Sequence, residues 1–311
     1  MAPVRVVCAV ALSLSLVPVA TLAQPAPPAT PARPRAGSSP TAGSPPFDMA
    51  RPIAARPTVF IEDMTWMEVR DAMAAGKKTV ILASGGIEMN GPYLVAGKHN
   101  IVLRATTAAI ARQLGNALVA PIVGFVPEGN IDPPSGMMRY PSTVGISEDT
   151  FKRLLTDIAN GLRVHGFEHI VMIADSGGNV NGMKAVAADL TAAWAGKNTT
   201  IHYIAEYYDY PALTTWLESQ ALVEVDEGHH DDLGITALMM VTDPSSVRMD
   251  ERLAAGRFSI NGINLAPAAT TIALGRRAAE WRAEQAVKAI RKVIPTPVSY
   301  THLTLPTSDL V

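Results

Sequence analysis

Short apolar runs alternate with segments of helical periodicity along the middle of the chain. The apolar runs, rich in β-branched residues, predict buried strands at 79–84, 117–125, 169–174 and 199–208. Helices are predicted around them at 66–77, 100–114, 147–165, 179–194, 211–222 and 275–293. The run 235–241 fits a helix or a strand, and we favour the helix. Strands separated by helices form a mostly parallel sheet covered on both faces. The pattern therefore predicts an α/β fold, a three-layer αβα single domain.

Both ends of the chain differ from this body. Residues 1–23 carry one early cation and then an apolar run ending in TLA, which predicts a secretory signal cleaved before Gln24; a membrane anchor is the alternative. Residues 24–57 are predicted to be a disordered tether, rich in Pro, Ala, Ser and Gly. The folded domain is predicted at 58–297. Residues 298–311 look like translated sequencing-adapter sequence, so we expect them not to belong to the natural chain.

Composition excludes several classes of protein. The chain has 26 Lys and Arg against 28 Asp and Glu and no basic cluster, so nucleic acid is not an expected partner. The single cysteine, Cys8, lies in the predicted signal, which excludes a disulfide or a cysteine metal site in the mature chain. A second long apolar run is missing, so we expect no membrane span in the mature chain. The expected location is the periplasm or exterior of a bacterium.

Two loops carry most of the candidate chemistry. GGIEMNGPYLVAGKHN (85–100) follows the first predicted strand, and ADSGGN (174–179) follows the third. Loops that follow parallel strands gather at the carboxyl edge of the sheet, where ligands bind. There they offer Glu88, His99 and Asp175. A capping or salt-bridge role is the structural alternative for Glu88, and a surface helix cap is the alternative for His99, which precedes a helix predicted to be capped by Asn100.

The sequence ADSGGN allows several interpretations. The backbone N–H groups of Gly177 and Gly178 can bind an anion or stabilise an oxyanion. Ser176 can be a nucleophile, although Ala174 stands where the pattern G-x-S-x-G has its first glycine. Asp175 or Ser176 can instead lie beside a metal, and a tight turn that needs glycine is the structural alternative.

Two further segments are candidates for the same cleft. EGHHDDLG (227–234) is either a solvated polar loop or places His230 and an aspartate such as Asp231 opposite Glu88. The Pro- and Gly-rich segment 126–145 is expected to wall the pocket, because long loops inside compact domains tend to be functional. Arg139 and Tyr140 on this loop are candidates for substrate contact.

These residues, in this order, resemble the creatininase family of metal-dependent amidohydrolases over about residues 60–293. EMNGPYLV (88–95) is similar to the family motif E-Q-H-G-P-H-L-P, YPST (140–143) to f-P-G-T, ADSGGN to N-G-H-G-G-N, and the segment 230–237 to H-A-G-E-x-E-T-S. The resemblance implies the αβα fold, hydrolysis of a small-molecule amide, and a ring of identical subunits.

The resemblance also implies a metal site, which is altered here. The family holds two divalent metals through the motif Glu, the motif His, a following Asp, the His of the glycine-rich loop and a further carboxylate. Glu88 is unchanged, whereas Asn90, His99, Ser176 and Ile235 stand at other positions of that set. Because a neutral imidazole has one lone pair and cannot bridge two metals as an aspartate does, we predict one metal per subunit.

The principal hypothesis is an exported hydrolase of a C–N amide bond in a small, linear or cyclic substrate. One divalent metal, with zinc favoured over manganese or iron, is predicted to be held by Glu88, His99, Asp175 and His230. Predicted catalytic residues are Asp175, Ser176 and His230, the last as a proton shuttle. Predicted substrate-binding residues are Asn90, Tyr93, Tyr140, Gly177, Gly178, Asn179 and Asp231.

Two alternatives belong to other classes. A serine hydrolase would use Ser176 as nucleophile and His230 as base, with Asp209 or Asp226 orienting the base, since that chain order is found in such enzymes. An exported, non-catalytic binding protein on the same fold would explain the loss of most family ligands.

Overall fold

The computed structural model describes residues 45–294. The predicted signal peptide, most of the predicted tether and the predicted adapter-derived tail lie outside this range. The chain divides into a unit Met1–Ala50, of which 45–50 are described, and a unit Arg51–Val311 that contains the fold. Within residues 45–294, none of the helices is both long and apolar enough to span a membrane.

A four-stranded parallel sheet forms the centre of the second unit, as predicted. Its strands are β1 (Thr79–Ser84), β2 (Ala117–Val119), β3 (His169–Ala174) and β4 (Thr200–Tyr203). They lie in the order β2-β1-β3-β4, with every pairing parallel. The chain leaves β1 toward β2 on one side, and later returns to place β3 on the other side of β1. The carboxyl ends of β1 and β3 are therefore a topological switch point, where open α/β sheets bind ligands.

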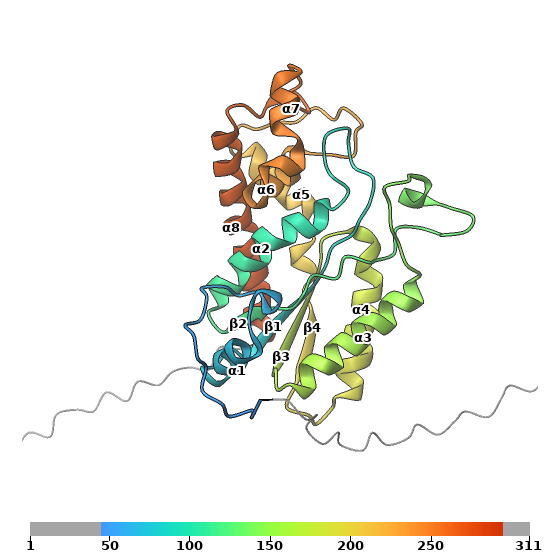
Figure 1. Cartoon of the computed structure of the whole chain (residues 1–311). Coiled ribbons are helices and arrows are strands. Elements are labelled where there is room, and N and C mark those ends of the chain that lie inside the picture. Colours follow the sequence, from blue (N-terminus) through green and yellow to red (C-terminus); the bar gives the residue numbers. More distant parts are fainter. Residues whose placement is uncertain (1–44, 295–311) are drawn as a thin grey trace, which may run out of the picture. The chain divides into compact units, whose positions relative to one another are not determined.

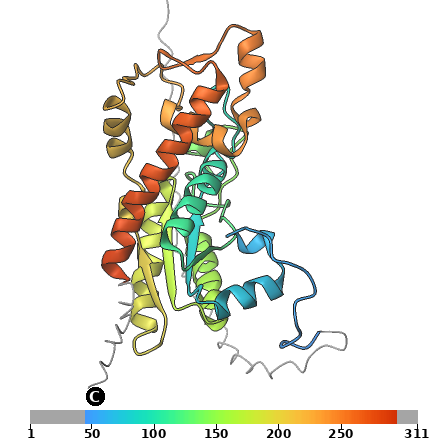
Figure 2. The same cartoon turned by 90° about the vertical axis from the view of Figure 1, so that its left-hand side faces the viewer.

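Helices cover both faces of this sheet (Figure 1). One face carries α3 (Glu148–Val164) and α4 (Val180–Ala193), with α1 (Trp66–Ala74) beside them. The other face carries α2 (Lys98–Leu114) and the long α8 (Ala268–Val293), which lie next to one another in Figure 2. The predicted three-layer αβα arrangement is confirmed.

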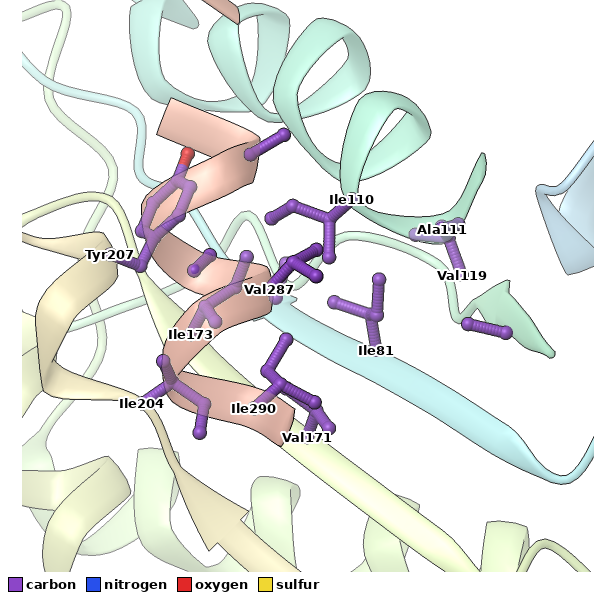
Figure 3. Packing of buried hydrophobic residues seen from close by; sticks show 14 of the residues in the cluster. Ile81, Ile110, Ala111, Val119, Val171, Ile173, Ile204, Tyr207, Val287 and Ile290 are labelled. Carbon is purple, nitrogen blue, oxygen red and sulfur yellow. The ribbon is translucent and has the colours of Figure 1, made fainter. Parts of the chain in front are cut away.

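Alternating strand residues divide the core into two layers. Figure 3 shows the α8 side, where Ile81 of β1 and Val171 of β3 face Ile110, Val287 and Ile290 from α2 and α8. The intervening strand residues point to the α3–α4 side, where they pack against side chains that include Phe151 and Leu155. A strand buried on both faces reads as an unbroken apolar run, which explains the pattern of the sequence.

A third apolar cluster lies beyond the sheet, around α5 (Tyr210–Glu218), α6 (Leu233–Thr242), α7 (Met249–Ala254) and the hairpin of β5 (Ser259–Ile260) and β6 (Ile263–Asn264). The helix favoured for 235–241 is confirmed as α6, whereas α7 and the hairpin were not predicted. Gly275 of α8 lies so close to the carbonyl of Ala237 in α6 that a Cβ there would collide with it. The two helices pack closely because this position is glycine.

Several predicted boundaries are wrong for identifiable reasons. Asn100 does not cap α2, which begins at Lys98; its Oδ1 instead accepts the N–H of Gly86 (3.1 Å). The strand predicted at 117–125 ends at Val119, shortly before Pro121, which has no N–H to pair. The strand predicted at 199–208 ends at Tyr203 and continues as the 3-10 helix η4 (Ala205–Tyr207).

The end of the predicted tether is part of the fold. Arg51 pairs with Asp71 of α1 (3.0 Å), and the backbone N–H of Arg56 donates to Glu68 (2.8 Å). The compact unit therefore begins at Arg51 rather than at residue 58.

Candidate active site

The two candidate loops meet at the switch point. Ser84 and Ala174, the last residues of β1 and β3, are in register. The N–H of Asp175 donates to the Ser84 carbonyl (3.0 Å), and Nδ2 of Asn179 donates to the Gly85 carbonyl (2.7 Å). These bonds hold the starts of both loops together, as expected for neighbouring parallel strands.

Glu88, His99 and Asp175 form one continuous hydrogen-bonded chain. Nε2 of His99 donates to Oε1 of Glu88 (2.8 Å), and Nδ1 donates to Oδ2 of Asp175 (2.9 Å). His99 lies in the first turn of α2, so this helix places the imidazole between the two strand ends. The prediction that Glu88 and His99 come together is confirmed, but both ring nitrogens are already occupied by carboxylates.

Two further cations complete the network. The ammonium of Lys98 lies 3.3 Å from Oε1 of Glu88, and the guanidinium of Arg282 lies 3.2 Å from Oδ1 of Asp175. The Tyr207 hydroxyl also donates to Oδ1 of Asp175 (3.0 Å). Asp175 is 0 % exposed and Arg282 only 4 %, so this end of the network is inaccessible to solvent.

The surroundings fix the charge of each group. Burial opposes ionisation of Glu88, but the hydrogen bond from His99 and the charge of Lys98 outweigh it and lower the pKa of Glu88 to about 2. Burial likewise opposes protonation of His99, yet its bonds to Asp175 and Glu88 raise the pKa of His99. The pKa of Asp175 is lowered, since the charge of Arg282 and the bond from His99 outweigh burial.

Glu128 is a buried carboxyl group behind Glu88 that we did not predict. Burial and the negative charge of Glu88 raise the pKa of Glu128 to about 8, and the two carboxyl groups are hydrogen-bonded. The Glu128 carboxyl rests against Gly86, where a Cβ would collide with Oε1. Glu128 is therefore protonated at neutral pH, keeps its proton, and donates a hydrogen bond to the Glu88 carboxylate.

A cavity of about 630 Å³ opens over this network. Glu88, Lys98 and His99 form its floor, and Ser176, Gly177, Tyr208 and Tyr210 line one wall. The two tyrosine rings meet edge to face with centroids 5.0 Å apart. The rest of the lining comes from α6 and from the segments around it: Glu224, Asp226, Gly228, His230, Asp231, Asp232, Ile235 and Asn261. This volume suits a small molecule.

The segment 227–232 forms the rim of the cavity. His230 is exposed, has a left-handed backbone (φ 54°), and donates from Nδ1 to the Met89 carbonyl (3.0 Å). Asp231 packs against Gly91, where a Cβ would collide with its carboxylate. The hypothesis that His230 and an aspartate share the cleft of Glu88 agrees with this geometry.

Within the described part of the chain, residues 45–294, five of the seven predicted substrate-binding residues lie outside the lining of this cavity. Asn90 donates to the carbonyls of Glu88 and Val95, which fixes its own loop. Asn179 is wholly buried between the strand ends. Tyr93 packs under the guanidinium of Arg252 (4.4 Å to the ring centroid). The other two are Tyr140, exposed on the loop 126–145, and Gly178, which lies against the Pro127 carbonyl.

The contacts do not assemble a serine relay. Ser176 has an extended backbone (φ −123°, ψ 143°), not the strained turn of a nucleophile elbow. Asp209 caps α5 through the N–H of Ala212, and Asp226 accepts the N–H of Gly228. The backbone of Gly177 lies against the Tyr208 hydroxyl, 3.0 Å from the place a Cβ would take.

Lys98 and Arg282 were also missed, although the sequence held a signal for Arg282. Ala278, Ala279, Ala283 and Ala286 form the buried face of α8, and Arg282 falls on that same face. An arginine on the apolar stripe of a helix needs a buried anion. Lys98 stands beside His99, but adjacent positions on a helix rarely face one point, so its role could not be predicted.

The comparisons with known proteins agree on one family. The family model "Creatininase: Creatinine amidohydrolase" matches residues 62–290. The chain is 24 % identical over 200 residues to the creatinine amidohydrolase of Pseudomonas putida, covering 62 % of this chain and 75 % of that protein.

Solved structures show the same fold. "Crystal structure of creatinine amidohydrolase (creatininase)" matches with a TM-score of 0.52 and 21 % identity, over 77 % of this chain and 97 % of that one. "Creatininase Mn" matches with a TM-score of 0.52 and 22 % identity, over 77 % and 100 %. A mutant creatininase of the "Zn-Zn type" matches with a TM-score of 0.51 and 22 % identity, over 77 % and 99 %. Since the family model spans most of the folded unit, the chain belongs to the creatininase family, whose characterised members are amidohydrolases.

Proposed function

We propose that this protein hydrolyses a C–N amide bond of a small molecule bound in the cavity at the switch point. One observation carries the proposal. In the fold of an amidohydrolase family, the floor of this cavity sets a buried carboxylate, Glu88, beside a buried ammonium, Lys98, at 3.3 Å. Buried charges of both signs at a cavity floor are typical of active sites.

Two of the similar creatininase structures are a manganese form and a zinc form, which supports the prediction of a divalent metal for the family. The side chains of this chain do not fit such an ion in the arrangement described. Both nitrogens of His99 bind carboxylates, and Glu88 already faces Lys98. Among residues 45–294, His, Cys, Asp and Glu side chains form no group of three able to hold a metal. No step below therefore uses one.

The chain's own residues supply the groups that amide hydrolysis needs. Lys98 can hydrogen-bond the carbonyl oxygen of the substrate and stabilise the negative charge that develops on it. Glu88, with a pKa of about 2, is a poor proton acceptor, so its part is to hold Lys98 and orient the attacking water. With Nδ1 of His230 bound to the Met89 carbonyl, its Nε2 can take the proton of this water and deliver it to the leaving nitrogen.

The test incubates the protein with a panel of small linear and cyclic amides and measures hydrolysis by the release of the amine product. We expect hydrolysis of at least one substrate by the full chain, and a loss of about 100-fold or more in kcat/KM in Lys98→Met. Asp209→Ala, which alters only a helix cap outside the cavity, is the matched control. Ligand-dependent thermal stabilisation without turnover would favour the non-catalytic hypothesis instead.

We also propose that the protein is exported and forms a homo-oligomer. The support for export is the pattern of residues 1–23, and the support for assembly is the family resemblance alone. Expression in a Gram-negative host with fractionation should place the protein in the periplasm with Gln24 as its first residue. Light scattering after size exclusion should give a mass above that of one chain.

A further inference from the structure

Fixed cations surround the two carboxylates at the carboxyl edge of the sheet. Glu88 faces Lys98 at 3.3 Å, and Asp175 faces Arg282 at 3.2 Å. His99 connects the two pairs through both ring nitrogens. Each carboxylate therefore has a positively charged side chain at the distance of a salt bridge.

The Arg282 side of this network has little freedom to rearrange. Arg282 also donates to the Tyr207 carbonyl (3.0 Å), and its guanidinium lies over the rings of Tyr207 (4.3 Å) and Tyr210 (5.2 Å). Tyr207 in turn hydrogen-bonds both Asp175 and Thr106 (3.0 and 2.7 Å). Releasing Asp175 to another cation would leave a guanidinium buried without its partner, which is strongly unfavourable.

The Glu88 side opposes a divalent ion by charge. An ion bound to Glu88 would lie within roughly 5 Å of the Lys98 ammonium, and repulsion at this range is strong where solvent is excluded. Lys98 is 5 % exposed, so water screens this charge little. A metal would also have to displace His99 from one of its two carboxylates.

We propose that Lys98 and Arg282 take the electrostatic place of the divalent metal, so that the folded protein binds neither zinc nor manganese at Glu88 and Asp175. The network then holds the two loops and the cavity floor in place by ion pairs between side chains. This inference concerns metal content and stability and does not depend on turnover, so it can fail while the proposed hydrolase activity stands, and the reverse.

The first test measures metal content. The full chain is incubated with excess ZnCl₂ or MnCl₂, desalted, and analysed by plasma mass spectrometry. We expect fewer than about 0.1 ions per chain, and melting temperatures that change by less than about 1 °C with zinc, manganese or EDTA. One ion retained per chain, or a melting temperature lowered by EDTA, would overturn the proposal.

The second test asks whether the charge of Lys98 stabilises the fold. Lys98→Gln should lower the melting temperature by at least about 5 °C, and Lys98→Arg, which keeps the charge, by less than half as much. Equal melting temperatures of Lys98→Gln and the natural chain would contradict the proposal. A variant with Lys98→Gln, Asn90→His, His99→Asp and Ser176→His restores three of the four family ligands that this chain lacks and serves as the positive control for metal uptake.

Discussion

The floor and the rim of the cavity are built differently. On the floor, Glu88 and His99 are buried and each polar group has a charged partner within 3.3 Å. On the rim, His230 is exposed and its Nδ1 hydrogen-bonds a backbone carbonyl. The floor comes from strand ends and a helix, whereas the rim is a loop between helices.

This difference separates two roles. Changing a floor residue leaves a buried charge without its counter-charge, so stability should fall together with activity. Changing a rim residue leaves no buried charge without a partner, so it should alter activity but not stability. We therefore expect the floor residues to be needed for folding, and the rim residues to determine which substrate is accepted.

The largest expected effect is in the buried network beneath the floor, at the pair of Asp175 and Arg282. Arg282→Met should reduce the free energy of unfolding by about 3–5 kcal/mol, because Asp175 keeps its negative charge in a site without water. Urea unfolding measures this loss. Asp175→Asn with Arg282→Met should be less destabilised than the sum of the single changes. A loss below about 1 kcal/mol in Arg282→Met would show that this pair is not a stabilising element.

A change at Glu128 should stabilise the protein at alkaline pH. The folded-state pKa of Glu128 is raised from 4.5 to about 8, so the stability of the natural chain falls as the pH rises through this interval. Glu128→Gln imitates the protonated acid and should gain about 3 kcal/mol at pH 8 and close to nothing at pH 5. Unfolding curves at four pH values would check this. A gain that is independent of pH would contradict the assignment.

A change at the rim should act on turnover. His230→Asn keeps a residue that tolerates the left-handed backbone but removes the imidazole that can carry a proton. We expect kcat to fall about 10- to 100-fold and the free energy of unfolding to change by less than about 0.5 kcal/mol. Steady-state kinetics and urea unfolding measure the two quantities. A stability loss as large as that of Arg282→Met would erase the distinction between floor and rim.

The smallest effect is expected outside the cavity. Asp209→Ala removes the side-chain cap of α5 and should reduce the free energy of unfolding by about 1 kcal/mol. Turnover should not change. A large loss of kcat would instead revive the serine-hydrolase hypothesis, in which Asp209 orients the base.

The sequence predicted the sheet better than the site. The runs at 79–84 and 169–174 became β1 and β3 without a change of boundary, because a strand buried on both faces has a continuous apolar pattern. The proximity of Glu88, His99 and Asp175 could be predicted because their loops follow the carboxyl ends of these two strands, which meet at one edge of the sheet. The 3-10 helix η4 and the hairpin β5–β6 escaped prediction, since short elements depend on tertiary contacts rather than on local pattern.

The partners of the site residues could not be predicted. Arg282 lies more than 100 residues from Asp175 along the chain, and only the packing of α8 on the sheet brings them together. Glu128 looked like one polar residue of a long loop, and its contact with Glu88 depends on the fold of that loop over Gly86. The prediction of His99 as a ligand placed it correctly but could not show that both nitrogens were occupied.

The position of Arg282 has a consequence for the synthesis of the protein. Asp175 enters the interior with β3, but its guanidinium partner is on α8, the last helix of the described chain. A nascent chain that has emerged only as far as α4 can pair this aspartate with His99 of α2 but still lacks the guanidinium. We expect the active-site region to remain incomplete on the ribosome until residue 282 has left the exit tunnel and α8 can pack on the sheet.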